Sequence, residues 1–419
     1  MQVDTEEILE ISQHFGKLED PRSHVNRKHL LGDLIVICIC GVLSGSDGPI
    51  AIGQWAKSKT VWLKEHLTLP NGIPSHDTIG RLLVALQPAA FQACFTSWIE
   101  AILQARESEL REEAEDPSLV EKRHIAIDGK TPRRSHDHRK QLGALHLVSA
   151  WAVDCGLSLG QLATAEKSNE ITAIPQLMDQ IEIKNAIITI DAAGCQREIA
   201  AKIVDGKGDY CLALKGNQGN LQEAARAWVE EQMRTDFADC RVETFESREK
   251  KKHGREEHYT YYQFEVPEDF PGREKWKKLR TIGVAIRFSK CGDKQTDEVR
   301  YYINSLPLNV KLFAKSVRGH WAIENTLHWC LDVTFREDDS RVRERNLTNN
   351  IAWLKRFAIS LLKQVPDKLS VAMRRRTCGW NENYLAQVLF GTSSPSKKGE
   401  LQLACGSGGT GLRHTRRRS

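Results

Sequence analysis

The sequence lacks an apolar run long enough to cross a membrane. Its longest such run, residues 34–43, falls well short of the roughly 20 residues that a bilayer span needs. No charged stretch followed by an apolar segment stands at its N-terminus, as a secretion signal would require. We therefore expect a chain that has no membrane partner and is not exported.

The sequence also lacks a cysteine framework. Its eleven cysteines follow no repeating spacing, and the pair Cys38 and Cys40 lies inside the apolar run, with no other metal ligand nearby. This pattern is typical of reduced thiols. It predicts a cytoplasmic protein, which in a bacterium works near the nucleoid.

Excess charge is nearly absent outside the C-terminus. The formal net charge is +5, and residues 392–419 alone carry that excess. A surface that binds a polyanion such as DNA must therefore come from local clusters of basic residues. Such clusters are Arg133-Arg134, 248–252, 275–280 and 374–376. With 40% hydrophobic and 27% charged residues the chain is predicted to fold, except for a disordered basic tail over residues 391–419.

Helical periodicity dominates residues 1–105, which we predict to form an all-helical N-terminal domain. The expected helices are 30–43, 50–66, 78–86 and 91–103. Residues 67–75 interrupt them, and Ser75 is placed to cap the next helix. This helix, turn and capped helix could bind DNA, or could be an ordinary bundle connection. An acidic linker is expected over 106–121.

A different pattern begins at residue 122. Strands are predicted at 124–128, 145–153, 157–163, 186–190 and 210–214, with helices at 171–181 and 196–204. This order is typical of an α/β layer with a mixed sheet over residues 122–220. Residues 221–305 are predicted to be a β-rich insertion that includes a helix at 222–233 and strands at 258–266, 281–288 and 299–303. Within residues 306–390, helices are predicted at 317–335, 350–363 and 384–390.

Two aspartates stand at predicted carboxyl ends of strands. Asp128 precedes Gly129, which allows close backbone approach, and Asp191 follows the apolar strand 186–190. Ligands bind at such strand ends in open α/β sheets, and Mg²⁺ takes one or two carboxylates together with phosphate and water. Either aspartate could instead be a helix cap or a turn residue.

A third acid is expected on the helix predicted at 317–335. Glu324, His328 and Asp332 recur at four-residue spacing and form one polar stripe. Such a stripe could supply a metal ligand, or could be a solvated helix face.

Taken together and in order, these motifs resemble one known family. They are AIDGKT, TIDAAGCQ with DYCLALKGNQ, and RGHWAIENTLHWCLDVTFREDDSRVR, preceded by DPRSHVNRKHLLGDL and NGIPSHDTIGRLL. The chain is similar to the insertion-sequence DDE transposases of the H-repeat-associated branch, whose catalytic core is ribonuclease-H-like. The resemblance spans most of the chain, up to about Tyr384.

The resemblance implies that Asp128, Asp191 and Glu324 are the catalytic, metal-binding triad for Mg²⁺ or Mn²⁺, with two ions expected. It also implies double-stranded DNA as partner, both terminal inverted repeats and target, and a homodimer on that DNA. The wider family places Tyr, Arg and Lys where this sequence has Val317, His320 and Leu331. The tail after Phe390 resembles no segment of the family.

Several polar side chains near these motifs are candidate DNA contacts. They are Arg133, Arg134, Lys215, Arg318, His320, Asn325, Arg341 and Arg343. The function implied is DNA cleavage and strand transfer during transposition. Two alternatives stay open: a nuclease that cuts without joining, and a catalytically silent DNA-binding relic of a transposase.

Overall fold

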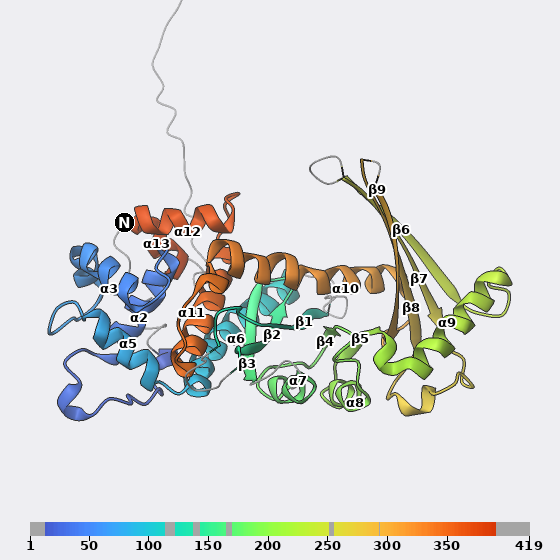
Figure 1. The fold of residues 1–419 in the computed structure, drawn as a ribbon, viewed down its shortest axis with the longest axis horizontal. Helices are drawn as coiled ribbons and strands as arrows, with labels where there is room; N and C mark the ends of the chain where they lie inside the picture. The colour runs from blue at the N-terminus through green and yellow to red at the C-terminus, as the bar shows by residue number, and fades with distance from the viewer. Residues whose placement is uncertain are drawn as a thin grey trace, which may run out of the picture.

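The computed structural model describes residues 13–113, 122–136, 143–164, 170–250, 255–292 and 294–390 (Figure 1). The predicted basic tail and the second half of the predicted linker lie outside these residues. None of the described helices is by itself long and apolar enough to cross a bilayer.

The first part of the chain is helical, as predicted. Its helices are α2 (Leu31–Leu43), α3 (Pro49–Ser58), α4 (Thr60–His66), α5 (His76–Ala85) and α6 (Pro88–Glu113). All of α2 from Asp33 onward is buried except Val36, which explains why its apolar residues surround the whole helix. The Ser75 hydroxyl accepts a hydrogen bond from the Thr78 amide at 3.2 Å, so the predicted cap of α5 is confirmed.

Two boundaries in this region differ from the prediction. The single helix expected over 50–66 is broken at Lys59 into α3 and α4. Helix α6 continues to Glu113, so the first half of the expected linker is helical. Glutamate and arginine are good helix formers, so the acidic composition there extends a helix and does not end one.

One nine-stranded mixed sheet runs through the rest of the molecule, in the order β3-β2-β1-β4-β5-β9-β8-β7-β6. The strands are β1 (Arg123–Lys130), β2 (His146–Ala152), β3 (Leu157–Thr164), β4 (Ala186–Ile190), β5 (Asp209–Leu214), β6 (Val242–Lys250), β7 (Arg255–Glu265), β8 (Thr281–Cys291) and β9 (Lys294–Asn304). Strands β1, β4 and β5 are parallel, and the other pairs are antiparallel. The first five strands give the mixed sheet expected of a ribonuclease-H-like core.

The β-rich segment does not form a sheet of its own. Strand β9 pairs with β5 over Tyr301–Asn304, so β6 to β9 continue the core sheet outward. In Figure 1 these four strands fan upward at one end of the molecule, with α9 (Gly219–Arg234) beside them.

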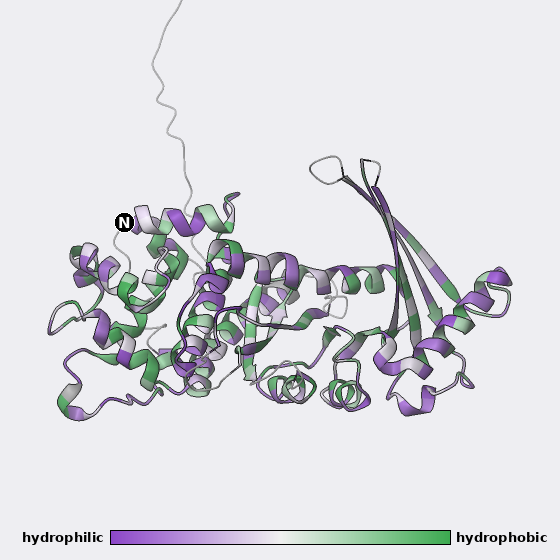
Figure 2. Cartoon of the chain, viewed as in Figure 1, coloured by the Kyte–Doolittle hydropathy of each residue, from purple (hydrophilic) through white to green (hydrophobic). Residues whose placement is uncertain are grey.

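Helices cover both faces of the core strands. Helices α7 (Glu170–Met178) and α8 (Arg197–Asp205) lie on one side, and α10 (Val310–Ala322) lies on the other (Figure 1). Three further helices, α11 (Arg345–Gln364), α12 (Val371–Trp380) and α13 (Glu382–Phe390), follow it. Helix α11 packs against both β3 and the N-terminal helices α2, α5 and α6, so the helical region and the core share one interior. Figure 2 shows hydrophobic residues gathered in α2 and the core strands, and a largely hydrophilic α9.

Candidate catalytic site

The parallel pairing of β1 and β4 brings the two predicted aspartates to one edge of the sheet. The register pairs Ile127 with Ile190, so Asp128 and Asp191 occupy the next position on neighbouring strands. Carboxyl ends of parallel strands are the usual place for a ligand in such sheets. The structure therefore brings together the two acids that the sequence analysis selected.

Gly129 keeps the backbone beside Asp128 close to a buried hydrogen bond between His146 and Glu170. His146 Nε2 lies 2.6 Å from Glu170 Oε1, and both side chains are buried. A Cβ at position 129 would overlap both groups, so only glycine fits there. The His146 ring is also held by the Thr131 hydroxyl at 2.7 Å, which fixes the end of β1.

Asp128 is a largely buried acid among other acids. Its side chain is 16% exposed, and Oδ1 accepts a hydrogen bond from the Gly129 amide at 2.9 Å. Burial raises the pKa of Asp128 to about 7, against the Gly129 hydrogen bond, and the negative charges of Asp191, Glu324 and Glu170 raise it further. A cation at this position would offset both the burial and the repulsion.

Asp191 is exposed just beyond β4. Its Oδ1 accepts hydrogen bonds from the amides of Ala193 at 3.0 Å and Gly194 at 3.3 Å, so one oxygen organises the turn into α8. Nearby, the Asn217 side chain donates to the Ala192 carbonyl at 2.6 Å. That bond ties the turn after β4 to the turn after β5, which carries the exposed Lys215.

Glu324 lies on a π-helical continuation of α10. The helix changes to π geometry over η8 (Ile323–His328) and again over η9 (Cys330–Thr334). Single-turn π segments are rare and are frequently found at functional sites. The helix expected over 317–335 is thus not an ordinary α-helix throughout. Its buried side is formed by Ile323, Leu327, Cys330 and Leu331.

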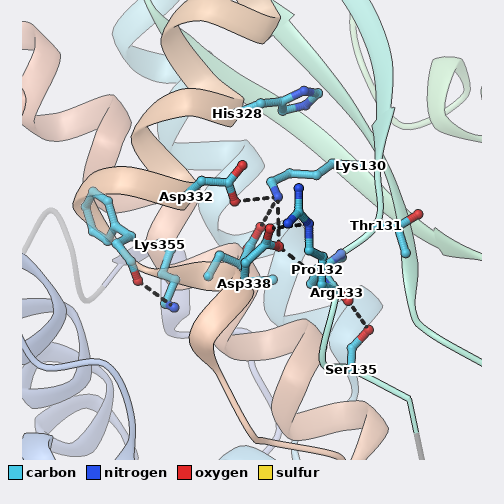
Figure 3. A network of polar contacts seen from close by, with 12 residues as sticks. Lys130, Thr131, Pro132, Arg133, Ser135, His328, Asp332, Asp338 and Lys355 are labelled. Carbon is cyan, nitrogen blue, oxygen red and sulfur yellow. Dashed lines mark hydrogen bonds and ion pairs between the residues drawn. The ribbon is translucent and has the colours of Figure 1, made fainter.

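The predicted polar stripe faces the end of β1. His328 Nδ1 lies 3.6 Å from Asp128 Oδ2, and the Lys130 amine donates to Asp332 Oδ1 at 2.6 Å. Figure 3 shows Asp332 pointing to Lys130, with His328 one turn away. Burial lowers the pKa of His328 to about 3, and the positive charges of Arg356 and Lys130 lower it further, so the ring is neutral at pH 7.

A network of opposite charges surrounds Lys130, whose side chain is 8% exposed. Besides Asp332, its amine lies 3.4 Å from Asp338 Oδ1 and 3.8 Å from Glu337 Oε2 (Figure 3). Glu337 in turn forms a salt bridge with the fully buried Arg356, whose Nη1 lies 2.9 Å from Glu337 Oε1. Asp332 is therefore neutralised by a partner, whereas Glu324 is exposed and no salt bridge to it is found among the described residues.

These acids do not form a closed metal cage. No three His, Cys, Asp or Glu side chains among the described residues are grouped so that they could hold a metal ion. The oxygens of Asp128, Asp191 and Glu324 are nevertheless the donor type that Mg²⁺ and Mn²⁺ prefer. Burial raises the pKa of Asp128, and the charges of Asp191 and Glu324 raise it further, which is a further reason why a cation fits there.

Comparison with known proteins decides the family. A family model described as "Transposase DDE domain" matches residues 120–362, and one described as "DDE_Tnp_1-associated" matches residues 12–99. The chain belongs to the DDE transposase family.

Two relatives in this family match nearly the whole chain. "Putative transposase YncI" of Escherichia coli O157:H7 is 37% identical over 92% of this chain and 96% of its own length. "H repeat-associated putative transposase YhhI" of E. coli K12 is 36% identical over 92% of this chain and 99% of its own length. The predicted family and branch are thus confirmed. A shorter relative, "Inactive transposase YbfQ" of E. coli K12, is 32% identical over 18% of this chain.

Two of the candidate DNA contacts of this family member line a pocket with Glu324. The pocket has a volume of about 410 Å³ and lies between η8, the end of α10 and strands β7 to β9. Arg318 and Asn325 stand in its wall with Trp321, Tyr259 and Arg300. The Arg300 guanidinium lies 4.0 Å from the centre of the Trp321 ring, and that of Arg318 lies 4.8 Å from the centre of Tyr259. Arg318 also pairs with Glu249, so its charge is partly offset.

The other candidate contacts occupy different surroundings. His320 Nδ1 lies 3.2 Å from the Thr189 hydroxyl, which is itself 3.0 Å from His124 Nε2, so His320 packs α10 onto β4. The exposed Arg133 pairs with Asp338 at 3.2 Å. Arg134, Arg341 and Arg343 are exposed on loops. As DNA contacts all of these remain predictions.

Sequence reasoning missed the charge network behind the site. Lys130, Glu337 and Arg356 were not selected, although Lys130 follows Asp128 by two residues and so lies on the same face of β1. That spacing was the available evidence. Glu337 and Arg356 could not be paired from sequence, because only the fold brings the turn after η9 beneath α11.

Proposed function

We propose that this chain is the transposase of a bacterial insertion sequence, which cleaves DNA at terminal inverted repeats and joins the freed ends to target DNA. The observation that carries the proposal is the meeting of Asp128 and Asp191 at neighbouring parallel strand ends, within electrostatic range of Glu324. These are the three acids that the family's motif implies.

Asp128, Asp191 and Glu324 would hold two Mg²⁺ or Mn²⁺ ions. Bound there, the ions would supply activation of water or a 3′-hydroxyl and stabilisation of the leaving oxygen in an in-line displacement. Two of the three acids are exposed, which leaves room for substrate phosphate among the ligands.

The rest of the site would grip and orient DNA. Arg318 and Asn325 lie beside Glu324 in the pocket, and Lys215 lies at the same sheet edge as Asp191. Positively charged side chains such as Arg318 and Lys215 contribute affinity for DNA phosphates and fix the orientation of the DNA, but they do not select its sequence. The neutral ring of His328, 3.6 Å from Asp128 Oδ2, would border the metal site without adding positive charge.

Recognition of the repeat ends would belong to the N-terminal helices, where α5 begins at the capped turn. Joining requires two ends at once, so a homodimer on DNA is part of the proposal. We place this activity in the cytoplasm, at the nucleoid.

The experiment is Mg²⁺-dependent cleavage and joining of DNA that carries the terminal repeats of the chain's own element. Wild type is compared with Asp191→Ala at identical salt, with circular dichroism and DNA binding as controls for folding. Cleavage and joining that disappear in the variant support the proposal. Cleavage without joining would support a nuclease instead, and specific binding without cleavage by either protein would support a silent relic.

A further inference from the structure

The exposed face of the helix that bears Glu324 carries aromatic and apolar side chains beyond the catalytic acid. Trp329 is 54% exposed and Val333 is 57% exposed. They follow Asn325 at four-residue spacing, about one helical turn each, so the three lie in a row along η8 and η9. Side chains this large are normally buried, and exposed apolar patches commonly mark binding sites.

This row connects two hollows in the surface. Asn325 stands in the wall of the pocket that also contains Glu324. Val333 and Thr334 line a second pocket of about 490 Å³, whose opposite wall is α12 with Arg376 and Trp380. Trp329 lies between Asn325 and Val333 in the sequence, and in Figure 1 α12 and the fan of β6 to β9 stand at the two ends of this helix.

The second pocket has a rigid base. The buried Arg375 donates to the Val42 carbonyl at 3.1 Å and the Thr334 carbonyl at 2.6 Å, and it pairs with Asp47 at 2.8 Å. Its guanidinium also lies 4.1 Å from the centre of the Phe335 ring. One side chain thus locks α2, η9 and α12 together, which fixes Trp380 relative to Val333.

The two groups on the α12 side suit an unpaired nucleic acid strand. Trp380 is 71% exposed, and no salt bridge to the exposed Arg376 is found within the described part of the chain. Tryptophan rings stack on bases of any sequence, and a free arginine beside them attracts phosphate. Arg374 and Arg375, in contrast, are used within the fold.

We infer that the row Asn325, Trp329 and Val333, with Trp380 and Arg376, is a stacking platform for an unpaired stretch of the DNA strand at the scissile phosphate. The inference rests on the proposed function. It says that the DNA strand runs from Glu324 along η8 and η9 toward α12.

Continuity with Glu324 favours DNA over a second copy of the chain. Whatever covers this face must leave the catalytic acid open to a phosphodiester. A strand that passes through the site does so, whereas a protein surface seated on Trp329 would crowd the adjacent pocket.

The test measures binding of fluorescent duplexes in EDTA, so that no cleavage occurs. One duplex is blunt, and the other carries an unpaired 3′ extension of four nucleotides. Wild type is expected to prefer the extended duplex. Trp329→Ala and Trp380→Ala should each lose about fivefold or more of affinity for it, because one stacked base contributes about 1–3 kcal/mol. Trp380→Tyr, which keeps an aromatic ring, retains most of that affinity.

Matched controls separate the platform from general surface changes. Met233→Ala removes an exposed apolar side chain on α9, and Arg197→Ala removes an exposed arginine on α8; neither should alter binding. Arg376→Ala should reduce the salt dependence of binding by about 0.7 in log–log slope, as for one lost phosphate contact.

Three outcomes would overturn the inference or separate it from the function. Unchanged binding by both tryptophan variants, with normal cleavage by wild type, contradicts the platform alone. If the tryptophan variants lose self-association in sedimentation but bind the extended duplex as wild type does, the face is a protein contact and the inference is overturned. Loss of extension binding in the variants, with no cleavage by wild type, supports the platform and contradicts the proposed function.

Discussion

The two ends of the polar stripe on η8 and η9 present acids in opposite electrostatic conditions. At one end Glu324 is exposed beside Asp128 and Asp191, where negative charges repel each other and raise the pKa of Asp128 to about 7 after the larger effect of burial. At the other end Asp332 receives a hydrogen bond from Lys130 at 2.6 Å, within a network that also contains Asp338 and Glu337.

The contrast shows that the environment of an acid, and not its spacing along a helix, decides its role. The charge of an acid that pairs with lysine is already compensated without a metal ion. Acids that lie close together without a cation repel one another, and this repulsion disfavours their ionised forms until a cation binds. The Asp332 end therefore holds β1 against the helix, and the Glu324 end is the one at which we propose that cleavage occurs.

The largest expected effect is at the acid-rich end. Asp128→Asn and Asp191→Asn each keep the shape of the side chain but remove a charge that a cation needs. We expect Mg²⁺-dependent cleavage to fall by about 10³-fold or more, since a metal contributes several kcal/mol to the transition state. Single-turnover cleavage measures this. Retention of more than a tenth of the wild-type rate by Asp191→Asn would remove that residue from the site.

The next effect is on stability at the neutralised end. Arg356→Met leaves Glu337 buried without its partner at 2.9 Å. Breaking a buried pair in this way costs about 3–5 kcal/mol. Urea unfolding measures the loss, and the double variant Arg356→Met with Glu337→Leu should recover much of it. No recovery would mean that the arginine acts by packing against its surroundings and not through Glu337.

The same pair predicts a dependence on pH. Burial alone would raise the pKa of Glu337, but Arg356, Lys355 and Lys130 hold it below its ordinary value of 4.5. The stabilisation by ionised Glu337 is therefore complete above about pH 4.5 and is lost as the pH falls through the lower folded-state value. Urea unfolding of wild type and Glu337→Gln between pH 3 and 6 tests this. The difference in stability between the two should shrink toward acid pH, and a constant difference would contradict the network.

A smaller effect is expected from the cation itself. Because the folded-state pKa of Asp128 is raised above its ordinary value of 3.8, ionisation of this group destabilises the metal-free protein as pH rises toward 7. Mg²⁺ should then raise the melting temperature by about 2–5 °C at pH 7.5 and by less at pH 5.5. Asp128→Asn should remove the difference between the two pH values. An equal Mg²⁺ effect in that variant would place the cation elsewhere.

Much of the core was predictable because strand periodicity is local. The strand at 186–190 has the bounds of β4 as predicted, and Asp191 follows it. Strand β6 was not foreseen because its sequence, VETFESREK, alternates charged residues with few apolar ones. Helix α12 was also missed. Its Arg374 and Arg375 suggested a nucleic-acid cluster, but they are held by carbonyls and carboxylates within the fold, which leaves only Arg376 exposed.

The site was predictable as a set of acids but not as an arrangement. Spacing put Glu324, His328 and Asp332 on one stripe, and that stripe does face β1. The role of Lys130 was not accessible from spacing, because its partner Asp332 lies 202 residues away in the chain. The π geometry of η8 was not predicted either.

We expect Glu324, and not Asp332, to hold the cation. Cleavage of terminal-repeat DNA by Glu324→Gln and Asp332→Asn, measured side by side at the same Mg²⁺ and salt concentrations, tests this expectation. Glu324→Gln should lose all measurable cleavage while still binding DNA, and Asp332→Asn should stay within about tenfold of wild type, because Lys130 keeps two other acidic partners. Full activity in Glu324→Gln together with loss of activity in Asp332→Asn would contradict it.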